Sequence, residues 1–186
     1  MILGLTGKNA SGKGEATNYL KTKGFVYYSL SDVIREEATK RGLEHLRDNL
    51  INLGNELRKK FGPSYLAKQI NNKIKQQLKN KNFVIDSIRN PHEISELSKN
   101  EGFVLVGVEA PIELRFKRLL ERNRLGDAKT LEEFRQQEQR ENLKSDTNQQ
   151  LDATFGMANK VISNNGSLKE LHKKIDKLLT EITKKK

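Results

Sequence analysis

The feature that most constrains this chain is a glycine-rich stretch that directly follows a short apolar run. The run Ile2–Thr6 suits a buried strand, the stretch Gly7–Gly14 reads Gly-Lys-Asn-Ala-Ser-Gly-Lys-Gly, and a helical pattern begins at Lys13. Glycines let the backbone curl so that successive N–H groups point inward at phosphate oxygens, and the following helix adds its N-terminal dipole. The order of strand, Gly-x-x-x-x-Gly-Lys loop and helix therefore predicts a phosphate-binding loop.

The same stretch could be a plain turn, but a turn has no need for two glycines and a lysine at this spacing. We predict that the loop binds the polyphosphate of ATP and that the Lys13 ammonium neutralises phosphate charge. The residues predicted to contact ATP here are Gly7, Lys8, Asn9, Ala10, Ser11, Gly12, Lys13, Gly14 and Glu15. Gly14 stands where Ser or Thr would offer Mg²⁺ a hydroxyl, so phosphates, water and a carboxylate elsewhere should hold the metal.

Further apolar runs recur along the chain, with helical spacing between them. The strand candidates are Ile2–Thr6, Phe25–Leu30, Phe83–Ile85, Phe103–Val108 and Lys160–Ile162, and the helix candidates are Lys13–Lys21, Asp32–Arg41, Leu46–Phe61, Ser64–Lys79, His92–Asn100, Ile112–Asn123, Leu131–Leu143 and Leu168–Ile182. This alternation predicts an α/β protein with the P-loop NTPase three-layer fold, in which helices cover both faces of a five-stranded parallel sheet. We expect residues 1–186 to form a single domain, with a helical acceptor-binding insert at about 31–80 and an arginine-rich lid at about 123–147.

The composition of the 186-residue chain restricts what else it can be. With 35 Lys and Arg against 24 Asp and Glu, the formal net charge of +11 favours nucleic acid, acidic lipid or phosphorylated small molecules as partners. The chain has no cysteine, which excludes thiolate chemistry. No apolar stretch approaches the ~18 residues of a membrane span, and Met1 leads into a strand pattern and not a leader sequence. We therefore expect a cytoplasmic protein with no membrane contact.

Two predicted strands are followed by side chains suited to a metal and an anion. Asp86 ends the third apolar run, at the carboxyl edge of the predicted sheet, where it would hold Mg²⁺ through water. The alternative for Asp86 is a turn or helix cap. Arg35 follows the second run, and its guanidinium fork suits a phosphate, although it could be a solvated surface residue. Arg58 is a weaker candidate for a second contact to the acceptor.

Arginines gather just before Gly126-Asp127, where the helical pattern is interrupted. Arg115, Arg118 and Arg122 are three and four residues apart and share a helical face, with Arg124 close behind. We predict that Arg118 and Arg122 belong to a lid that closes on the transferring phosphoryl group and excludes water. The alternative is a solvated helix with ion pairs between residues four apart.

Two sets of residues carry a family resemblance. The Gly-Lys-Gly ending of the loop resembles adenylate kinases and related nucleoside monophosphate kinases, and Gly4–Gly7 together with Ile162–Leu168 resembles dephospho-CoA kinases. The likeness implies ATP and Mg²⁺ as cofactors, and it implies that Arg35 and Arg89 bind the acceptor phosphate. Arg89 follows Asp86 by three residues, whereas adenylate kinases more often have an Asp-Gly-Phe-Pro-Arg pattern at this place. This departure leaves the acceptor base open.

The dephospho-CoA kinase resemblance adds two roles. It implies that Asp32 could accept the proton of an acceptor hydroxyl, a base that a phosphate acceptor would not need. It also implies that backbone groups at Asn165, in the loop after the last strand, contact the adenine of ATP. A simple glycine-containing turn is the equal alternative for that loop.

Together these features predict an ATP-dependent phosphotransferase that acts on small-molecule nucleotides. A nucleoside monophosphate is the favoured acceptor, and dephospho-CoA is the main alternative. A nucleotide-dependent switch or an RNA-associated ATPase would be a different class, but no basic stripe interleaved with aromatics supports a nucleic-acid partner. The histidines His45, His92 and His172 have no metal-ligand spacing and are expected on the surface. The sequence does not indicate the oligomeric state.

Overall fold

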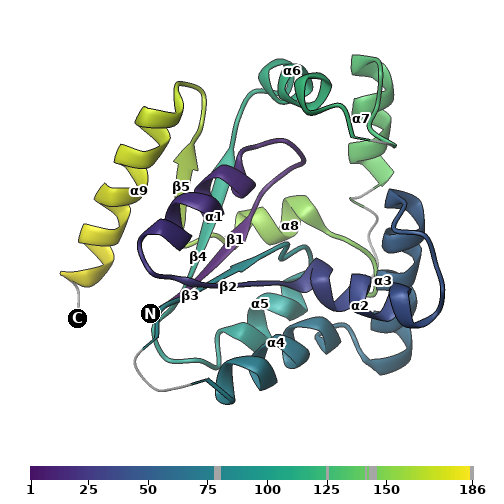
Figure 1. Cartoon of the computed structure of the whole chain (residues 1–186), viewed down its shortest axis with the longest axis horizontal. Helices are drawn as coiled ribbons and strands as arrows, with labels where there is room; N and C mark the ends of the chain where they lie inside the picture. Colours follow the sequence, from purple (N-terminus) through teal and green to yellow (C-terminus); the bar gives the residue numbers. More distant parts are fainter. Residues whose placement is uncertain (78–80, 125, 141, 143–145, 185–186) are drawn as a thin grey trace.

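The centre of the protein is a five-stranded parallel sheet (Figure 1), seen in a computed structural model that describes residues 1–77, 81–124, 126–140, 142 and 146–184. The strands are β1 (Ile2–Thr6), β2 (Val26–Ser29), β3 (Phe83–Asp86), β4 (Phe103–Glu109) and β5 (Lys160–Ser163), and they lie in the order β2-β3-β1-β4-β5. Every strand pair is parallel, so all five carboxyl ends lie on one edge of the sheet. The loop after β1 is at the middle of that edge.

The sheet has a hydrophobic core on each face because successive side chains of a strand point to opposite sides. On one face, Leu3 and Leu5 pack with α1 (Lys13–Thr22) and α9 (Leu168–Thr183). On the other face, Ile85 and Leu105 pack with a second set of helices (Figure 1). These are α2 (Leu30–Lys40), α3 (Arg47–Phe61), α4 (Tyr65–Lys75) and α5 (Pro91–Leu97). The predicted three-layer α/β fold is confirmed.

A third, smaller core joins two helices beyond the carboxyl edge of the sheet. It contains the buried side chains of Leu119, Ala128 and Phe134, from α6 (Ile112–Arg122), α7 (Leu131–Arg140) and the segment between them. Figure 1 shows these two helices standing together at one end of the molecule. Ala10 of the loop after β1 packs against this core, so the two helices are attached to the carboxyl edge of the sheet.

Several elements differ from the prediction in their bounds, and one helix was not predicted. The second strand stops at Ser29 and not at Leu30, because the Ser29 hydroxyl accepts a hydrogen bond from the Ser31 amide at 3.2 Å and caps α2. The helix α8 (Leu151–Gly156) was not predicted, since six residues are too few for a helical repeat to show. α4 ends at Lys75 and α5 at Leu97, before the predicted ends at Lys79 and Asn100. Lys79 itself and the predicted helix end at Leu143 lie outside the described residues. Within the described ranges, no helix is long and apolar enough to cross a membrane.

Candidate functional site

The loop after β1 is curled tightly, and two of its glycines cannot be replaced without a clash. Gly7 has φ +143° and Gly12 has φ +104°, conformations that side chains rarely adopt. A Cβ on Gly7 would lie 2.1 Å from the Val108 carbonyl oxygen, and one on Gly12 would lie 2.0 Å from the Asn164 Nδ2. The loop is therefore pressed between the end of β4 and the β5–α9 loop, which explains why both positions are glycine.

The Lys13 ammonium lies across this curled loop at the start of α1. Its Nζ donates to the Gly7 carbonyl at 2.7 Å and to the Lys8 carbonyl at 3.0 Å. Two buried polar atoms of the loop, Asn9 Nδ2 and Ser11 Oγ, have no hydrogen-bond partner among the described residues. Loop amides, an ammonium, a helix N-terminus and unsatisfied donors together fit a polyphosphate such as that of ATP.

The segment after β3 is fixed beside the phosphate loop. The Thr6 hydroxyl donates to the Ile88 carbonyl at 3.0 Å, which ties the end of β1 to this segment. Asp86 accepts a hydrogen bond from the Ser87 amide at 2.6 Å, where Ser87 has φ 65° and the chain turns sharply. Burial raises the pKa of the Tyr27 phenol on β2, and the negative charge of Asp86 adds to the shift. The carboxylate thus stands at the sheet edge, where the sequence places it.

The side chains around the loop fit Mg²⁺ only as an ion that is bound mainly by the nucleotide phosphates and by water. Among the described residues, no group of three or more His, Asp and Glu side chains could hold a metal ion. Mg²⁺ commonly keeps several waters and uses one or two carboxylates together with substrate phosphates. Asp86 can supply such a carboxylate, so the residues fit a metal that arrives with its nucleotide.

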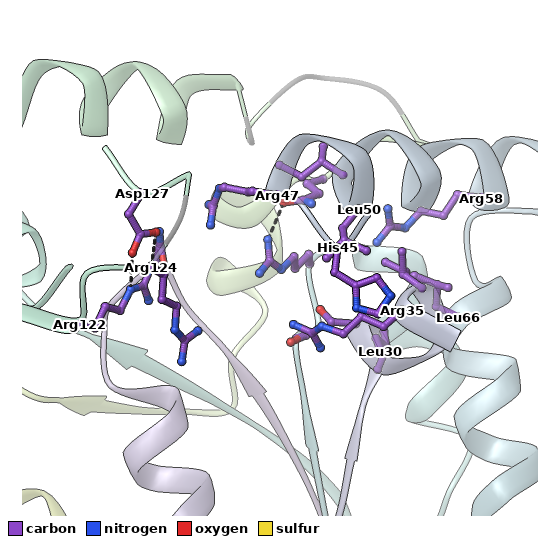
Figure 2. A pocket seen from close by; sticks show the side chains of 17 residues that line it. Leu30, Arg35, His45, Arg47, Leu50, Arg58, Leu66, Arg122, Arg124 and Asp127 are labelled. Carbon is purple, nitrogen blue, oxygen red and sulfur yellow. Dashed lines mark hydrogen bonds and ion pairs between the residues drawn. The ribbon is translucent and has the colours of Figure 1, made fainter. Parts of the chain in front are cut away.

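A cavity of about 250 Å³ opens between the insert helices and the segment after α6 (Figure 2). Its lining is Asn9, Leu30, Ser31, Ile34, Arg35, His45, Arg47, Leu50, Ile51, Arg58, Leu66, Ser87, Arg89, Arg122, Arg124, Asp127 and Gln149. Six of these residues are arginines, and Asp127 is the one carboxylate among them. The apolar residues come mainly from α2 and α3. The cavity is therefore suited to a small anionic ligand with an uncharged part.

The structure brings two of the residues predicted to bind the acceptor, Arg35 and Arg89, to the wall of this cavity. Arg35 Nη1 lies 2.7 Å from Asp32 Oδ1, and both side chains are about half exposed. Arg89 Nη1 donates to the Gln149 Oε1 at 3.0 Å. Asp32 is not a lining residue of the cavity but pairs with Arg35, which is one. Its role as a base stays a prediction.

Arg58 also lines the cavity, but its guanidinium is buried in an ion pair. Its Nε and Nη2 donate to one Glu93 oxygen at 2.9 and 2.8 Å. The other Glu93 oxygen accepts from the backbone amides of Arg89 and Asn90 at 2.9 and 3.1 Å. Arg58 therefore braces the segment that carries Arg89, a connection through Glu93 that the sequence did not indicate.

Arg118 and Arg122, the arginines predicted to belong to a lid, lie on α6 and approach the phosphate loop. Arg122 makes a bidentate pair with Asp127, with distances of 2.8 and 2.7 Å, and its Nη2 also donates to Asn9 Oδ1 at 3.1 Å. Arg118 Nη2 donates to the Asn164 carbonyl at 3.0 Å, and its buried Nη1 has no partner among the described residues. Arg122 thus joins the loop to the cavity, and Arg118 joins α6 to the β5–α9 loop.

Arg115, on the same helical face, is buried and serves as a structural link. Its guanidinium pairs with Glu138 of α7 and donates to the Ala110 carbonyl at 2.9 Å and to the Asn9 carbonyl at 3.2 Å. A buried ion pair therefore joins α6 to α7, and the same arginine connects α6 to the backbone of the phosphate loop.

The β5–α9 loop contacts the phosphate loop through a residue that the sequence analysis did not select. The Asn164 side chain is 4% exposed, and its Nδ2 donates to the Ser11 carbonyl at 2.9 Å. Asn165, the neighbour predicted to lie near adenine, is exposed. The Asn-Asn-Gly sequence marked the loop, but only the fold shows which asparagine faces inward.

The curled loop, the sheet order and the arginine-lined cavity define a P-loop protein of the nucleotide-kinase-like class. A family model described as an AAA domain matches residues 6–135. The chain is 32% identical to a UPF0200 protein of Pyrococcus horikoshii, covering 98% of this chain and 97% of the relative, and 33% identical to one of Thermococcus kodakarensis with full coverage of both. The chain belongs to the UPF0200 family.

One relative is longer than this chain. The UPF0200/UPF0201 protein of Archaeoglobus fulgidus is 33% identical over 98% of this chain, but the chain spans only 56% of that relative. The shared part is therefore the region that corresponds to the fold described above.

Solved structures show the same architecture at low identity. The Thermus thermophilus protein TT1252 gives a TM-score of 0.64 at 22% identity, with 97% of each chain covered. Shikimate kinase from Aquifex aeolicus gives 0.53 at 16% identity, again with 97% of each chain covered. At these identities the likeness shows the kinase-like P-loop fold and nothing finer.

Proposed function

We propose that this protein is an ATP-dependent phosphotransferase that moves the γ-phosphoryl of ATP to a small phosphorylated acceptor, with a nucleoside monophosphate as the favoured acceptor. We also propose that residues 1–186 act as a single domain in the cytoplasm. The observation that carries the activity is Arg122, which contacts Asn9 of the phosphate loop and also lines the arginine-rich cavity. The Arg122 guanidinium therefore lies between the proposed ATP site on the loop and the proposed site of the accepting phosphate in the cavity.

The donor half of the proposed reaction rests on the loop. The loop amides and Lys13 bind the β- and γ-phosphates, and Arg118 and Arg122 stabilise charge on the transferring group. When bound, Mg²⁺ would neutralise charge on the same phosphates, held through water by Asp86. Holding the donor in this way orients it in line with the acceptor.

The acceptor half rests on Arg35 and Arg89. These arginines hold the accepting phosphate, one of its oxygens forms a bond to the γ-phosphorus, and the bond from that phosphorus to the bridging oxygen of ADP breaks. An ionised phosphate oxygen has no proton to lose, so a nucleoside monophosphate needs no base. A hydroxyl acceptor such as dephospho-CoA would need one, and the half-exposed Asp32 is the candidate.

The test is phosphoryl transfer by the purified protein with ATP, Mg²⁺ and a panel of nucleoside monophosphates plus dephospho-CoA. ADP release and the phosphorylated product are both measured. We expect the Lys13→Ala variant to lose roughly 100-fold or more in rate, because it removes one preorganised charge from the transition state. Lys21→Ala, an exposed lysine on the same helix, is the matched control and should keep the wild-type rate.

Two results would contradict the proposal. Steady ATP hydrolysis with no acceptor phosphorylated across the panel would point to a nucleotide-dependent switch. Full transfer by a folded Lys13→Ala protein would exclude the loop as the donor site.

A further inference from the structure

The phosphate loop contains a second lysine, whose ammonium pairs with a helix outside the loop. Lys8 Nζ lies 3.0 Å from Asp152 Oδ1 of α8, whereas Lys13 Nζ donates to two carbonyls of the loop itself. The side chains of Lys8 and Asp152 are 39% and 62% exposed. Exposed ion pairs contribute little to stability, because water screens the charges and both side chains lose conformational freedom. The contact between Lys8 and Asp152 is therefore weak, and a stronger anion can replace it.

The backbone of Lys8 lies beside the expected position of the γ-phosphate. The Lys13 ammonium, which is proposed to bind the β- and γ-phosphates, lies 3.0 Å from the Lys8 carbonyl oxygen. The next residue, Asn9, accepts a hydrogen bond at 3.1 Å from Arg122, which is proposed to stabilise charge on the transferring group. The Lys8 side chain starts between these two cations, and its flexible four-carbon stem lets the ammonium turn in either direction.

Open space surrounds the ion pair between Lys8 and Asp152. Both side chains line a cavity of about 450 Å³ that is bounded by the phosphate loop, the end of β4 and α8. Both also line a neighbouring cavity of about 350 Å³ beside α7. The Lys8 ammonium therefore has room to leave Asp152 without displacing packed side chains.

We propose that Lys8 exchanges Asp152 for the γ-phosphate when ATP binds, so that Lys8 and Lys13 hold the transferring group together. This inference rests on the proposed function and adds a side chain that recognises the γ-phosphate. The exchange is driven by charge, because a terminal phosphate offers up to about two negative charges and three acceptor oxygens, whereas the carboxylate carries one charge. ADP has no γ-phosphate, so Lys8 stays paired with Asp152 in the ADP complex. The Lys8 ammonium therefore makes the loop prefer ATP to ADP.

The test compares the binding of ADP with that of AMP-PNP, an ATP analogue that keeps three phosphates but resists transfer. Each nucleotide is titrated with Mg²⁺ into the purified protein by calorimetry, without an acceptor. Lys8→Met should weaken AMP-PNP binding roughly 10-fold, as expected for a hydrogen bond between charged groups, and should change ADP binding less than about twofold. Lys8→Arg keeps the positive charge and should retain most of the AMP-PNP affinity.

Asp152→Asn separates this role from that of a structural ion pair, because the two roles predict opposite signs. Asparagine removes the charge that competes for Lys8, so AMP-PNP should bind roughly two- to threefold more tightly, while ADP affinity stays the same. A pair that only supported the loop would instead give weaker binding of both nucleotides in Lys8→Met and in Asp152→Asn.

The double variant Lys8→Met/Asp152→Asn excludes a simpler electrostatic effect. General repulsion between Asp152 and the phosphates would persist without Lys8, so its removal would still tighten AMP-PNP binding. Competition for Lys8 would not persist, so the double variant should have the AMP-PNP affinity of Lys8→Met.

A second ion pair of the same kind supplies the matched controls. Lys23 Nζ lies 3.0 Å from Asp176 Oδ1, with side chains that are 40% and 47% exposed, and neither residue lines the cavities at the loop. Lys23→Met and Asp176→Asn should therefore leave the ratio of AMP-PNP to ADP affinity unchanged. Circular dichroism and thermal melts confirm that each variant is folded.

Three results would overturn the exchange. They are equal changes in AMP-PNP and ADP affinity in Lys8→Met, weaker AMP-PNP binding by Asp152→Asn, and a double variant that binds AMP-PNP more tightly than Lys8→Met. In each case, phosphoryl transfer by the wild-type protein would leave the proposed function standing. If the wild-type protein binds neither nucleotide, the exchange is excluded, and the transfer assay decides the proposed function separately.

Discussion

Replacing Glu93 with glutamine would leave the Arg58 guanidinium buried without its carboxylate. Glu93 is 0% exposed and Arg58 is 1% exposed, so neither charge can be solvated by water. Removing one partner of a buried ion pair typically costs about 3–5 kcal/mol, because the remaining charge is uncompensated. We expect Glu93→Gln to lower the free energy of unfolding by about 3 kcal/mol, at the low end, because the amide oxygen can still accept the two backbone N–H bonds.

Arg58→Met, alone and combined with Glu93→Gln, tests whether the loss in free energy of unfolding comes from the ion pair and not from either residue by itself. Arg58→Met alone leaves Glu93 buried, but the carboxylate keeps its hydrogen bonds to the Arg89 and Asn90 amides. In Arg58→Met/Glu93→Gln no buried charge remains, so part of the lost stability should return. We expect the sum of the two single effects to exceed the effect of the double variant by about 2 kcal/mol.

The assay is urea unfolding of all four proteins, with the midpoint and slope fitted for each. A coupling energy below about 0.5 kcal/mol would refute the reasoning, since the two residues would then act independently. The same variants separate stability from positioning. Because Glu93 joins Arg58 to the segment that carries Arg89, either single variant loosens that segment. The KM for the acceptor should therefore rise in both Glu93→Gln and Arg58→Met, while the KM for ATP changes little.

The remaining predictions concern the phosphate loop and one helix cap. Gly12→Ala should abolish ATP binding and lower the melting temperature, whereas Gly14→Ala should keep both, because a Cβ at Gly14 has no atom within 4 Å among the described residues. Ser167→Ala removes the N-cap of α9 and should cost about 1 kcal/mol in urea unfolding, with unchanged activity. Hydrogen bonds from Ser167 lower the pKa of Glu170, so its stabilisation is present above its ordinary pKa of 4.5 and is lost as the pH falls through the lowered value. Acid titration of Glu170→Gln should therefore show a weaker loss of stability below pH 4.5 than the wild type.

Local patterns predicted the parts of this protein that local physics determines. The glycine positions of the loop follow from backbone conformation, and the buried strands follow from continuous apolar runs, so both could be read from the sequence. The helix α8 could not be, because its six residues are held by a tertiary contact. Phe155 of α8 packs over Gly107, where a Cβ would lie only 2.7 Å from its ring.

The ion pair and the hydrogen bond that hold the site in place could not be predicted from the sequence, for a related reason. Arg58 and Glu93 are 35 residues apart, and Asn164 and Ser11 are 153 apart, so neither pairing leaves a periodic signal. An arginine near a predicted binding site is therefore assigned to the ligand by default. The fold shows that Arg58 has a protein carboxylate as its partner, and that the carboxylate also positions Arg89.

The net charge of +11 left nucleic acid, lipid and small phosphates as possible partners, and the position of the arginines favours the small phosphates. A polymer backbone needs cations spread along an open face, since its phosphates repeat at regular intervals. Here six arginines line one cavity of about 250 Å³, and Arg122 also contacts the phosphate loop. A cavity of this size admits a small molecule and not a strand, so the arginines that line it favour a compact phosphorylated ligand over a polymer.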